Sequence, residues 1–249
     1  MSVKIVFLGT GAAIPLRRGL PCIALRVGPD IYLLDVGEGC QHRLFRHGLS
    51  PLRIRGVFIT HLHGDHYLGV FGLLQTMHLM RKSGLISIFA PKGFGELANT
   101  VLGPVSKRLG YQLEIKEITP GVLYTGQGVE VRAYPVNHTV EAYGFHLKIG
   151  DKTLCYTGDT APTLSVVENC ASVHILIHEA TFTSDEAEEA REEKHSTARD
   201  AAIIASRTEA KTLVLTHISA RHEKQDLLRD ATRHYQNTII AEDGQTLYL

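Results

Sequence analysis

The run GVFITHLHGDH, residues 56–66, constrains the fold more than any other part of this 249-residue sequence. A short apolar β-type stretch ends there in three histidines and an aspartate within six residues. Extended backbone points residues two apart to the same side, so His61 and His63 are expected to share one metal ion. The chain then turns at a glycine, which carries Asp65 and His66 toward a second ion.

This motif alone cannot complete two metal sites, so further ligands are expected at the ends of other strands. Three positions meet the requirement: His138 in PVNHT, Asp159 in CYTGDT and His217 in LVLTH each follow an apolar β-type run. Strand ends are where open α/β sheets usually build their sites. Imidazole and carboxylate ligands together suit zinc and its first-row neighbours.

Short β-type runs bounded by Gly, Pro or polar turns alternate with helical patterns along the chain. At 44% hydrophobic residues the chain can bury a large core, and a single domain over residues 1–249 is expected. Two β-rich halves, each finished by helices, predict an α/β fold with two sheets and outer helices. The expected strands are 3–9, 22–28, 31–37, 54–60, 113–118, 129–136, 143–150, 152–159, 173–180 and 212–217, and the expected helices are 67–84, 185–208 and 223–234.

Charge and cysteine content narrow the class of protein. Lys and Arg together number 26, and so do Asp and Glu, so no overall basic field draws the chain to nucleic acid. The four cysteines show no CxxC spacing and are expected to be reduced, as in a cytoplasmic protein. The first apolar run is too short for a signal peptide or a membrane span, and no membrane partner is expected.

Several motifs together resemble the metallo-β-lactamase superfamily and, within it, the ribonuclease Z family. They are FLGTGAAIP, LLDVGEGCQHR, FITHLHGDHYLGVFGLL, YGF, GDT, HEATF, HSTARDAA and LTHISAR, and they extend to residue 221. The resemblance implies the metallo-β-lactamase fold, an αβ/βα sandwich of two β-sheets flanked by helices. It also implies two Zn²⁺ ions per chain, with Mn²⁺ as the alternative metal.

The resemblance further implies which side chains hold the two ions. One zinc would be bound by His61, His63 and His138, the other by Asp65, His66 and His217, and Asp159 would bridge them.

Phosphodiester hydrolysis needs an activated water, charge relief on the phosphoryl oxygens and a proton for the departing alkoxide. The resemblance gives Asp65 a second role in deprotonating the water. His195 in KHST would contact the scissile phosphate and protonate the leaving oxygen, with Glu179 of HEAT orienting its ring. Asp35, which ends the run IYLLD, is expected to support a ligand histidine from behind.

One feature of the family is missing. Bacterial ribonuclease Z enzymes carry a flexible arm that grips the tRNA elbow, inserted between the ligands that match His138 and Asp159. Here those residues are 21 apart, and a hairpin turning at Gly150 and Asp151 is expected between them. RNA contacts would then depend on a local basic patch. Its candidate residues are Arg17, Arg18, Arg43, Arg46, Arg53, Arg55, Arg81 and Lys82.

Three functions remain open. The first is a ribonuclease Z-type endonuclease that processes the 3′ end of precursor tRNA, in a family that commonly forms homodimers. The second is an arm-less phosphodiesterase for small or cyclic diesters. The third is a non-catalytic metal-binding protein, which would have no use for His195 and Glu179. Assays of a tRNA precursor and a small diester side by side separate the first two.

Overall fold

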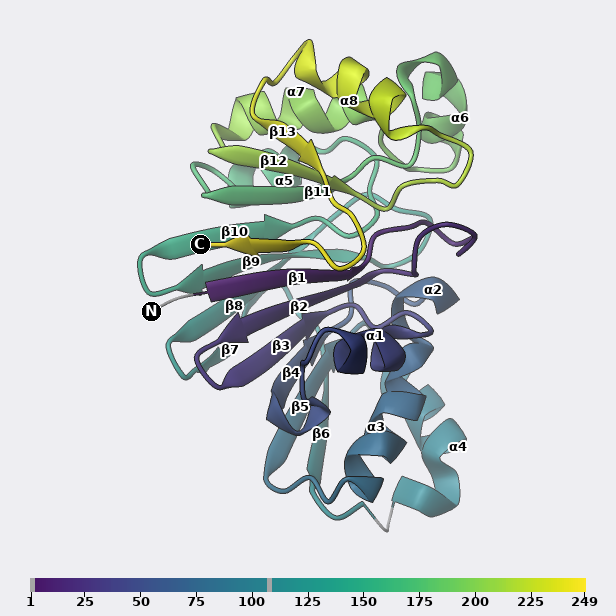
Figure 1. Ribbon diagram of the computed structural model, residues 1–249, viewed down its shortest axis with the longest axis vertical. Coiled ribbons are helices and arrows are strands. Elements are labelled where there is room, and N and C mark those ends of the chain that lie inside the picture. Colours follow the sequence, from purple (N-terminus) through teal and green to yellow (C-terminus); the bar gives the residue numbers. More distant parts are fainter. Residues whose placement is uncertain (1–2, 107–108) are drawn as a thin grey trace. The chain divides into compact units, whose positions relative to one another are not determined.

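The computed structural model describes residues 3–106 and 109–249, and the chain divides into two compact units. Each unit contains one seven-stranded mixed sheet with helices (Figure 1). Unit 1 comprises Met1–Gly9, Gly19–Ile118 and Asp243–Leu249, and unit 2 comprises Thr10–Arg18 and Thr119–Glu242. The expectation of a single domain over the whole chain stays a prediction.

The sheet of unit 1 has the order β14-β1-β2-β3-β4-β5-β6. Strands β3 to β6 are parallel, so helices must return the chain between them. The carboxyl ends of β3 and β4 therefore meet at one edge of the sheet. The strands are β1 (Val3–Gly9), β2 (Cys22–Val27), β3 (Asp30–Leu34), β4 (Ile54–Phe58), β5 (Leu85–Ala90), β6 (Gln112–Glu117) and β14 (Thr246–Tyr248); the helices are α1 (Cys40–Arg46), η1 (Pro51–Arg53), α2 (Gly64–Tyr67), α3 (Gly69–Leu79) and α4 (Phe94–Ser106).

Helix α3 packs its apolar face against the sheet of unit 1. Val70, Leu73, Leu74 and Met77 are buried and recur at the spacing of one helical face. They join the same apolar cluster as Leu33 and other side chains of β1 to β5. Strand β3, which is antiparallel to β2 and parallel to β4, is buried along its whole length.

The sheet of unit 2 has the order β13-β12-β11-β10-β9-β8-β7. Strands β7 to β10 are antiparallel neighbours, whereas β10 to β13 are parallel and joined through helices. The strands are β7 (Gly121–Gly126), β8 (Val129–Pro135), β9 (Tyr143–Ile149), β10 (Lys152–Tyr156), β11 (Ile175–Glu179), β12 (Thr212–Thr216) and β13 (Thr238–Ile240); the helices are α5 (Leu164–Asn169), η2 (Ser184–Glu186), α6 (Ala187–Glu192), α7 (Ala198–Thr208) and α8 (Lys224–Thr232).

Two expected helices differ from the structure. The helix expected over 185–208 is two helices, because Lys194 adopts a left-handed φ of 53° and Thr197 begins α7 with a capping box to Asp200. The break between them contains His195. The helix expected over 67–84 ends at Leu79. Strands β5, β7, β13 and β14 and helices α1, α4 and α5 were not expected.

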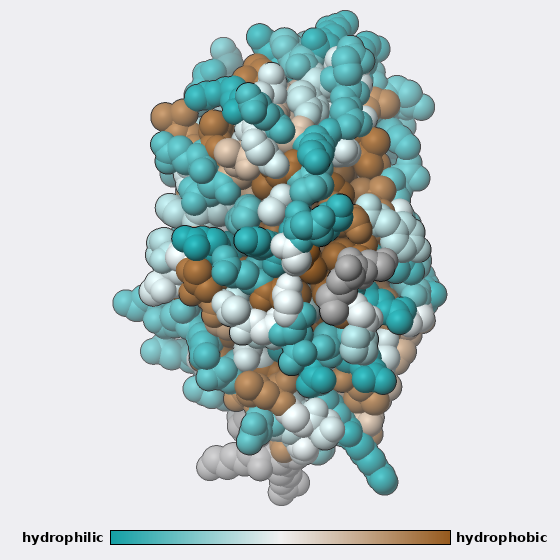
Figure 2. Space-filling model, turned by 90° about the vertical axis from the view of Figure 1, so that its left-hand side faces the viewer, coloured by the Kyte–Doolittle hydropathy of each residue, from teal (hydrophilic) through white to brown (hydrophobic). Residues whose placement is uncertain are grey.

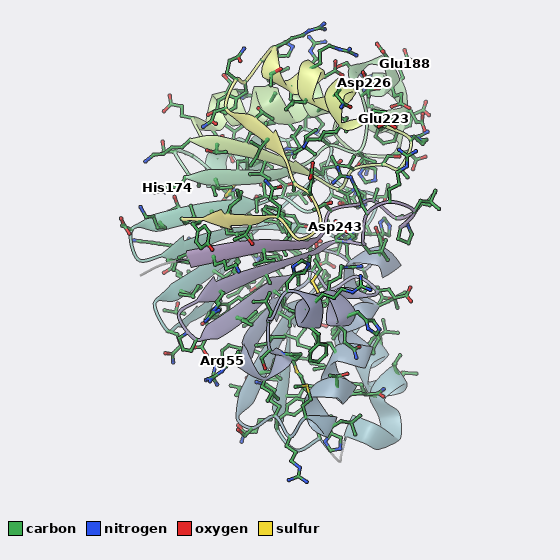
Figure 3. All side chains as sticks on the ribbon, in the orientation of Figure 1. Arg55, His174, Glu188, Glu223, Asp226 and Asp243 are labelled. Carbon is green, nitrogen blue, oxygen red and sulfur yellow. A yellow bond between two sulfur atoms is a disulfide. The ribbon has the colours of Figure 1, made fainter. Side chains whose placement is uncertain are left out.

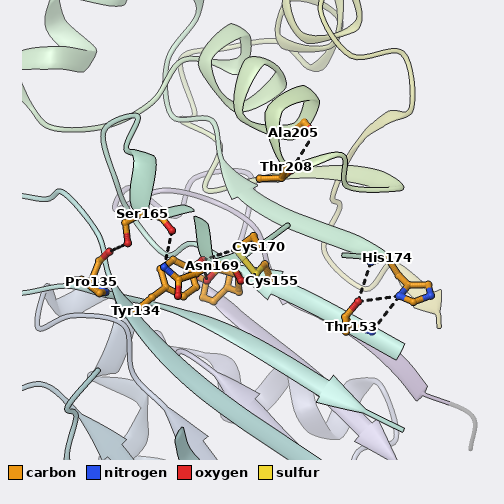
Figure 4. The surroundings of a disulfide bond; sticks show 11 residues. Tyr134, Pro135, Thr153, Cys155, Ser165, Asn169, Cys170, His174, Ala205 and Thr208 are labelled. Carbon is orange, nitrogen blue, oxygen red and sulfur yellow. Dashed lines mark hydrogen bonds between the residues drawn. A yellow bond between two sulfur atoms is a disulfide. The ribbon is translucent and has the colours of Figure 1, made fainter. Parts of the chain in front are cut away.

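The expectation of reduced cysteines is wrong. Cys22 pairs with Cys40 at a Cα–Cα distance of 6.0 Å. Cys155 pairs with Cys170 at 5.8 Å (Figure 4). These distances are usual for disulfides. One bond joins the start of β2 to the start of α1, and the other joins β10 to the end of α5. Sequence spacing does not reveal such pairs, because tertiary packing brings the partners together.

Candidate metal centre

The THLHGDH motif of unit 1 leaves β4 and enters the short helix α2. The ring centroid of His61 lies 4.7 Å from that of His63 and 4.1 Å from that of His66. The Nε2 atom of His66 lies 3.5 Å from a carboxylate oxygen of Asp65. The motif therefore brings its four side chains close together, and their predicted division between two metal ions stays a prediction.

A buried carboxylate supports this cluster from the end of β3. Asp35 accepts hydrogen bonds from the backbone N–H of Thr60 at 2.8 Å and from its hydroxyl at 3.0 Å. Its other oxygen lies 2.8 Å from Nδ1 of His66. The Thr60 hydroxyl donates its proton to Asp35, so it accepts from Nδ1 of His61, 3.0 Å away. These contacts at Nδ1 orient both imidazoles, and the structure shows the expected contact of Asp35 with a histidine of the motif. That this histidine binds a metal stays a prediction.

Unit 2 brings together residues that are far apart in the sequence. Asp159 follows β10 and His217 follows β12, and the Nε2 atom of His217 lies 3.3 Å from a carboxylate oxygen of Asp159. With His195, each residue offers one ligand atom, and these atoms lie within 4.8 Å of one another. The parallel strands end at the same edge of the sheet, which explains the convergence.

Glu179, at the end of β11, supports this second cluster. Its Oε1 accepts from Nδ1 of His195 at 2.7 Å and from the backbone N–H of Thr160 at 2.8 Å. Its Oε2 accepts from the hydroxyl of Thr181 at 2.7 Å, and that hydroxyl lies 2.8 Å from Nδ1 of His217. Burial raises the pKa of Glu179, but the charge and hydrogen bond of His195 outweigh it and the net pKa is lowered. The carboxylate therefore stays ionised at neutral pH.

His138 lies in unit 2 beyond the end of β8. Its Nδ1 donates to the backbone carbonyl of Lys194 at 3.1 Å, and its ring centroid lies 5.0 Å from that of His195. Burial lowers the pKa of His138, which favours the neutral imidazole that binds metals. Lys194 in turn donates from its ammonium group to the carbonyl of His138 at 3.2 Å.

The break between α6 and α7 fixes the position of His195. Its backbone N–H donates to the carbonyl of Ala190 at 2.8 Å, and the hydroxyl of Ser196 donates to the carbonyl of Thr160 at 2.6 Å. Sequence reasoning found His195 but missed the support that Ser196, Thr181 and Thr160 supply. The adjacent positions of these hydroxyl residues in HST, HEAT and GDT are the only sequence signal for that support.

The donor set of each unit fits a divalent metal ion. In five histidines Nδ1 is held by a carboxylate, hydroxyl or backbone carbonyl, and such a contact orients Nε2 for coordination. Each unit also places an aspartate beside one of these Nε2 atoms. Imidazole with carboxylate is the ligand chemistry of zinc and its first-row neighbours.

The basic patch expected from the sequence is largely used for internal contacts. Arg17 pairs with Glu223, and Arg55 pairs with Asp30, each at 2.9 Å or less (Figure 3 labels Arg55). Further members bond backbone carbonyls or a hydroxyl, because short loops bring these groups to them. They are Arg18 to Thr10 and Ala241, Arg43 to Leu20 and Glu38, and Lys82 to Leu52.

Residues 32–218 match the family model described as Beta-lactamase superfamily domain. Two curated proteins named Ribonuclease Z are similar over almost their whole length. The protein of Haloferax volcanii is 32% identical, covering 99% of this chain and 95% of that protein. The protein of Methanothermobacter thermautotrophicus is 30% identical, covering 98% and 96%.

Solved structures agree. Human tRNase Z, short form, superposes with a TM-score of 0.86 at 30% identity, covering 98% of each chain. The metallo-β-lactamase fold protein YhfI of Bacillus subtilis has a TM-score of 0.88 at 19% identity over all of both chains, which shows the fold alone. The chain is thus a member of the β-lactamase superfamily with the metallo-β-lactamase fold, as the motifs predict. Within that superfamily it belongs to the ribonuclease Z family.

This chain is shorter than these relatives in one respect. The alignment with the Haloferax volcanii protein spans 303 positions, more than the 249 residues of this chain. Between His138 and Asp159, β9 and β10 form a direct antiparallel hairpin in which Ile149 pairs with Lys152. The expected hairpin is confirmed, and this interval contains no inserted arm.

Proposed function

We propose that the chain is a zinc-dependent phosphodiesterase that cuts precursor tRNA endonucleolytically at its 3′ end. The family assignment carries the proposal, because proteins named Ribonuclease Z match almost the whole chain at 30% and 32% identity. The 2.7 Å contact between the buried carboxylate of Glu179 and Nδ1 of His195 supports turnover rather than metal storage.

We assign seven side chains to two ions. The set is His61, His63 and His138 for one ion, Asp65, His66 and His217 for the other, and Asp159 shared by both. Support comes from the donor chemistry of each unit, since the set combines imidazoles with carboxylates. Zn²⁺ is the proposed metal, and Mn²⁺ is the alternative.

When bound, paired divalent ions supply charge stabilisation for the phosphoryl oxygens and lower the pKa of the attacking water. Asp65 takes the proton that this water loses. His195 donates a proton from Nε2 to the departing alkoxide, while Glu179 holds Nδ1 and stabilises the imidazolium form. A carboxylate that is ionised at neutral pH suits this role, because it raises the basicity of the ring it contacts.

Two measurements test the proposal together. Elemental analysis of protein purified without chelator should give about two zinc-like ions per chain, because seven ligands exceed the four of a structural zinc site. One ion or none after metal supplementation would contradict the dinuclear assignment. Incubation with a 3′-extended tRNA precursor should yield a single cut at the end of the acceptor stem, and an uncut precursor would contradict the substrate assignment.

The direct β9–β10 hairpin favours one alternative, a phosphodiesterase for small or cyclic diesters. A chain without an arm has fewer means to hold a large polyanion, but its chemistry would cleave any diester that fits. Turnover of a cyclic nucleotide or an aryl diester, with no cleavage of the tRNA precursor, would select this alternative.

We further propose a cytoplasmic homodimer, because the proposed substrate is intracellular and the resemblance implies a dimer. Within the part of the chain that the structure describes, no helix is both long and apolar enough to cross a bilayer. The two disulfides are unusual for a reducing compartment, although intracellular proteins of hyperthermophiles contain them. Thiol labelling in fresh lysate tests the compartment, and light scattering tests the dimer.

A further inference from the structure

The neutral overall charge is divided unevenly between the two units. Unit 1 contains 12 Lys and Arg residues against 8 Asp and Glu, whereas unit 2 contains 14 against 18. Figure 3 labels three of the acidic side chains of unit 2, Glu188, Glu223 and Asp226, near α6 and α8. Local positive charge drives binding to a polyanion, so unit 1 has the charge that suits one.

A row of side chains crosses three strands of unit 1. Lys4 on β1 pairs directly with Arg26 on β2 and with Tyr248 on β14. Side chains directly opposite across antiparallel strands project from the same face of the sheet. Arg26 is exposed, and Tyr248 is 69% exposed. Like charges in this position destabilise a sheet, so the Lys4–Arg26 pair costs stability that a bound anion would offset.

Two cavities flank the side chain of Arg26. One of about 240 Å³ is lined by Arg26, Ser50 and Arg53 together with apolar and glycine residues. The other, of about 350 Å³, is lined by Lys4, Arg26, Gly28 and Tyr248. Among the residues that the structure describes, no acidic side chain lines either cavity.

The acidic residue of the β2–β3 hairpin, Asp30, forms an ion pair with Arg55. Asp30 begins β3 and is buried, and its carboxylate accepts from Nε of Arg55 at 2.8 Å. We call Lys4, Arg26, Arg53 and Tyr248 the Arg26 surface. It combines three cations with an exposed aromatic ring and lacks a carboxylate among its lining residues.

The Arg26 surface lies at the opposite end of β3 from the metal-ligand cluster of unit 1. Arg26 pairs with Ile31 at the start of β3, and Asp35 directly after that strand holds His66. Five residues of strand separate the two ends by about 17 Å. In Figure 1 the β2–β3 turn and the end of β14 lie on the same side, and Figure 2 shows hydrophilic residues interspersed with hydrophobic patches on that side.

We propose that the Arg26 surface binds the sugar–phosphate backbone of RNA, at a point about 17 Å from the metal ligands along β3. The guanidinium groups of Arg26 and Arg53 suit bidentate contact with phosphate, and Lys4 adds a point charge. Tyr248 offers a ring for a base or ribose to stack on. The inference rests on the proposed function for the choice of RNA as the polyanion, and it gives this arm-less chain a second RNA contact.

The test is a salt series of binding affinities for an acceptor-stem minihelix that ends at the cleavage position, so that no bond is cut. The variant Lys4→Ala/Arg26→Ala/Arg53→Ala should bind about 10- to 100-fold more weakly at 0.1 M salt and lower the salt slope by about 2 to 3. Turnover of a small aryl diester should not change.

A matched control removes three exposed lysines that belong neither to the Arg26 surface nor to the expected basic patch. The variant Lys92→Ala/Lys116→Ala/Lys148→Ala has the same net charge and should keep the wild-type slope within about 0.5. The single variant Arg26→Lys keeps the positive charge and should therefore have the salt slope of the wild type. Because the like-charged pair destabilises the sheet, the Lys4→Ala and Arg26→Ala changes should leave the melting temperature equal or higher.

The outcomes separate this inference from the proposed function. Equal slopes for the two triple variants, in a protein that still cuts precursor tRNA, would overturn the Arg26 surface alone. Minihelix binding that the first triple variant loses, without any cleavage of precursor, would support the surface and reject the proposed reaction. Binding of anionic phosphatidylserine vesicles but not of RNA would overturn the inference in favour of a membrane surface.

Discussion

The two units build their clusters with the same arrangement, a buried carboxylate that holds one histidine directly and a second through a threonine hydroxyl. In unit 1, Asp35 contacts Nδ1 of His66 at 2.8 Å and reaches Nδ1 of His61 through Thr60. All of these side chains are fully buried. The result is two imidazoles that are both held at Nδ1, a contact that orients a ring for coordination through Nε2.

In unit 2, Glu179 contacts Nδ1 of His195 at 2.7 Å and reaches Nδ1 of His217 through Thr181. The difference lies in the histidine that is held directly. In unit 1 it is a proposed ligand, whereas His195 is the proposed acid and its side chain is 16% exposed. If the proposed roles hold, one arrangement serves two tasks: it orients ligands where the ring is buried, and it stabilises the charged form of a proton donor where the ring reaches solvent.

The variant Asp65→Ala should have the largest effect and would distinguish the two units most clearly. Asp65 and Asp159 each lie beside a histidine Nε2 in their unit, but only Asp65 is also proposed to deprotonate the water. We expect phosphodiesterase activity to fall below detection, because a ligand and a base are lost together. Circular dichroism should show a folded protein, and the exposed Glu96→Ala variant should keep full activity. Activity within tenfold of wild type would remove Asp65 from the mechanism.

His195→Ala tests whether the directly held histidine of unit 2 differs in role from that of unit 1. Turnover should fall by about 10²- to 10⁴-fold, the usual contribution of a general acid, with metal content unchanged. The loss should be smaller for a nitrophenyl diester, whose leaving group needs little protonation. The counterpart His66→Ala should instead lose metal. Equal losses on good and poor leaving groups would assign His195 to phosphate binding.

Changes to the two supporting carboxylates, Asp35 and Glu179, should have smaller effects, and these effects should differ between the units. Asp35→Asn should weaken metal affinity by about 10- to 100-fold in a chelator competition, because it contacts a proposed ligand directly. Asparagine tolerates the left-handed φ of 54° at this position, so the fold should persist. Glu179→Gln should lower turnover on poor leaving groups more than metal affinity. Matching losses of metal affinity in both variants would show that the two carboxylates have one task.

The same contrast explains how much of the site the sequence reveals. The proposed ligands of unit 1 lie within six residues, so spacing alone indicates a shared site. Those of unit 2 occur at three separate strand ends, and His138, Asp159 and His217 become convincing only as a set. Strand periodicity predicts most of the strands that carry these ligands. It does not predict the break at Lys194, because a left-handed residue within a helical pattern has no periodic signature.

The sequence does not predict contacts between residues that only tertiary packing brings together. The disulfides join residues 18 and 15 apart with no recognisable spacing. Five of the eight residues of the expected basic patch also form internal contacts, and the patch itself stays a prediction. From the sequence, Arg55 and Arg43 both appear as charges that could contact a ligand. In the structure Arg55 forms an ion pair with Asp30, and Arg43 donates hydrogen bonds to backbone carbonyls. The number of basic residues near a site therefore overstates the charge that is available to a ligand.

The smallest expected effect concerns the size of the substrate. An arm that grips the tRNA elbow is absent between His138 and Asp159, so the remaining contacts must reach the acceptor stem and the single-stranded 3′ end. Fewer phosphates are then neutralised than in a relative with an arm, and binding should be weaker and less salt-sensitive. The Arg26 surface, about 17 Å from the ligands of unit 1 along β3, is within reach of the same stem.

A precursor minihelix without the tRNA elbow should therefore be cut within about threefold of the rate of the full precursor, because phosphate contacts near the cleavage site position both. Rates are compared as kcat/KM at one salt concentration, with equal 3′ trailers on the two RNAs. A full precursor cut about a hundredfold faster would mean that another surface of this protein contacts the elbow. A difference that disappears in the Lys4→Ala/Arg26→Ala/Arg53→Ala variant would identify the Arg26 surface as that contact, since removing it would leave both RNAs with the same grip.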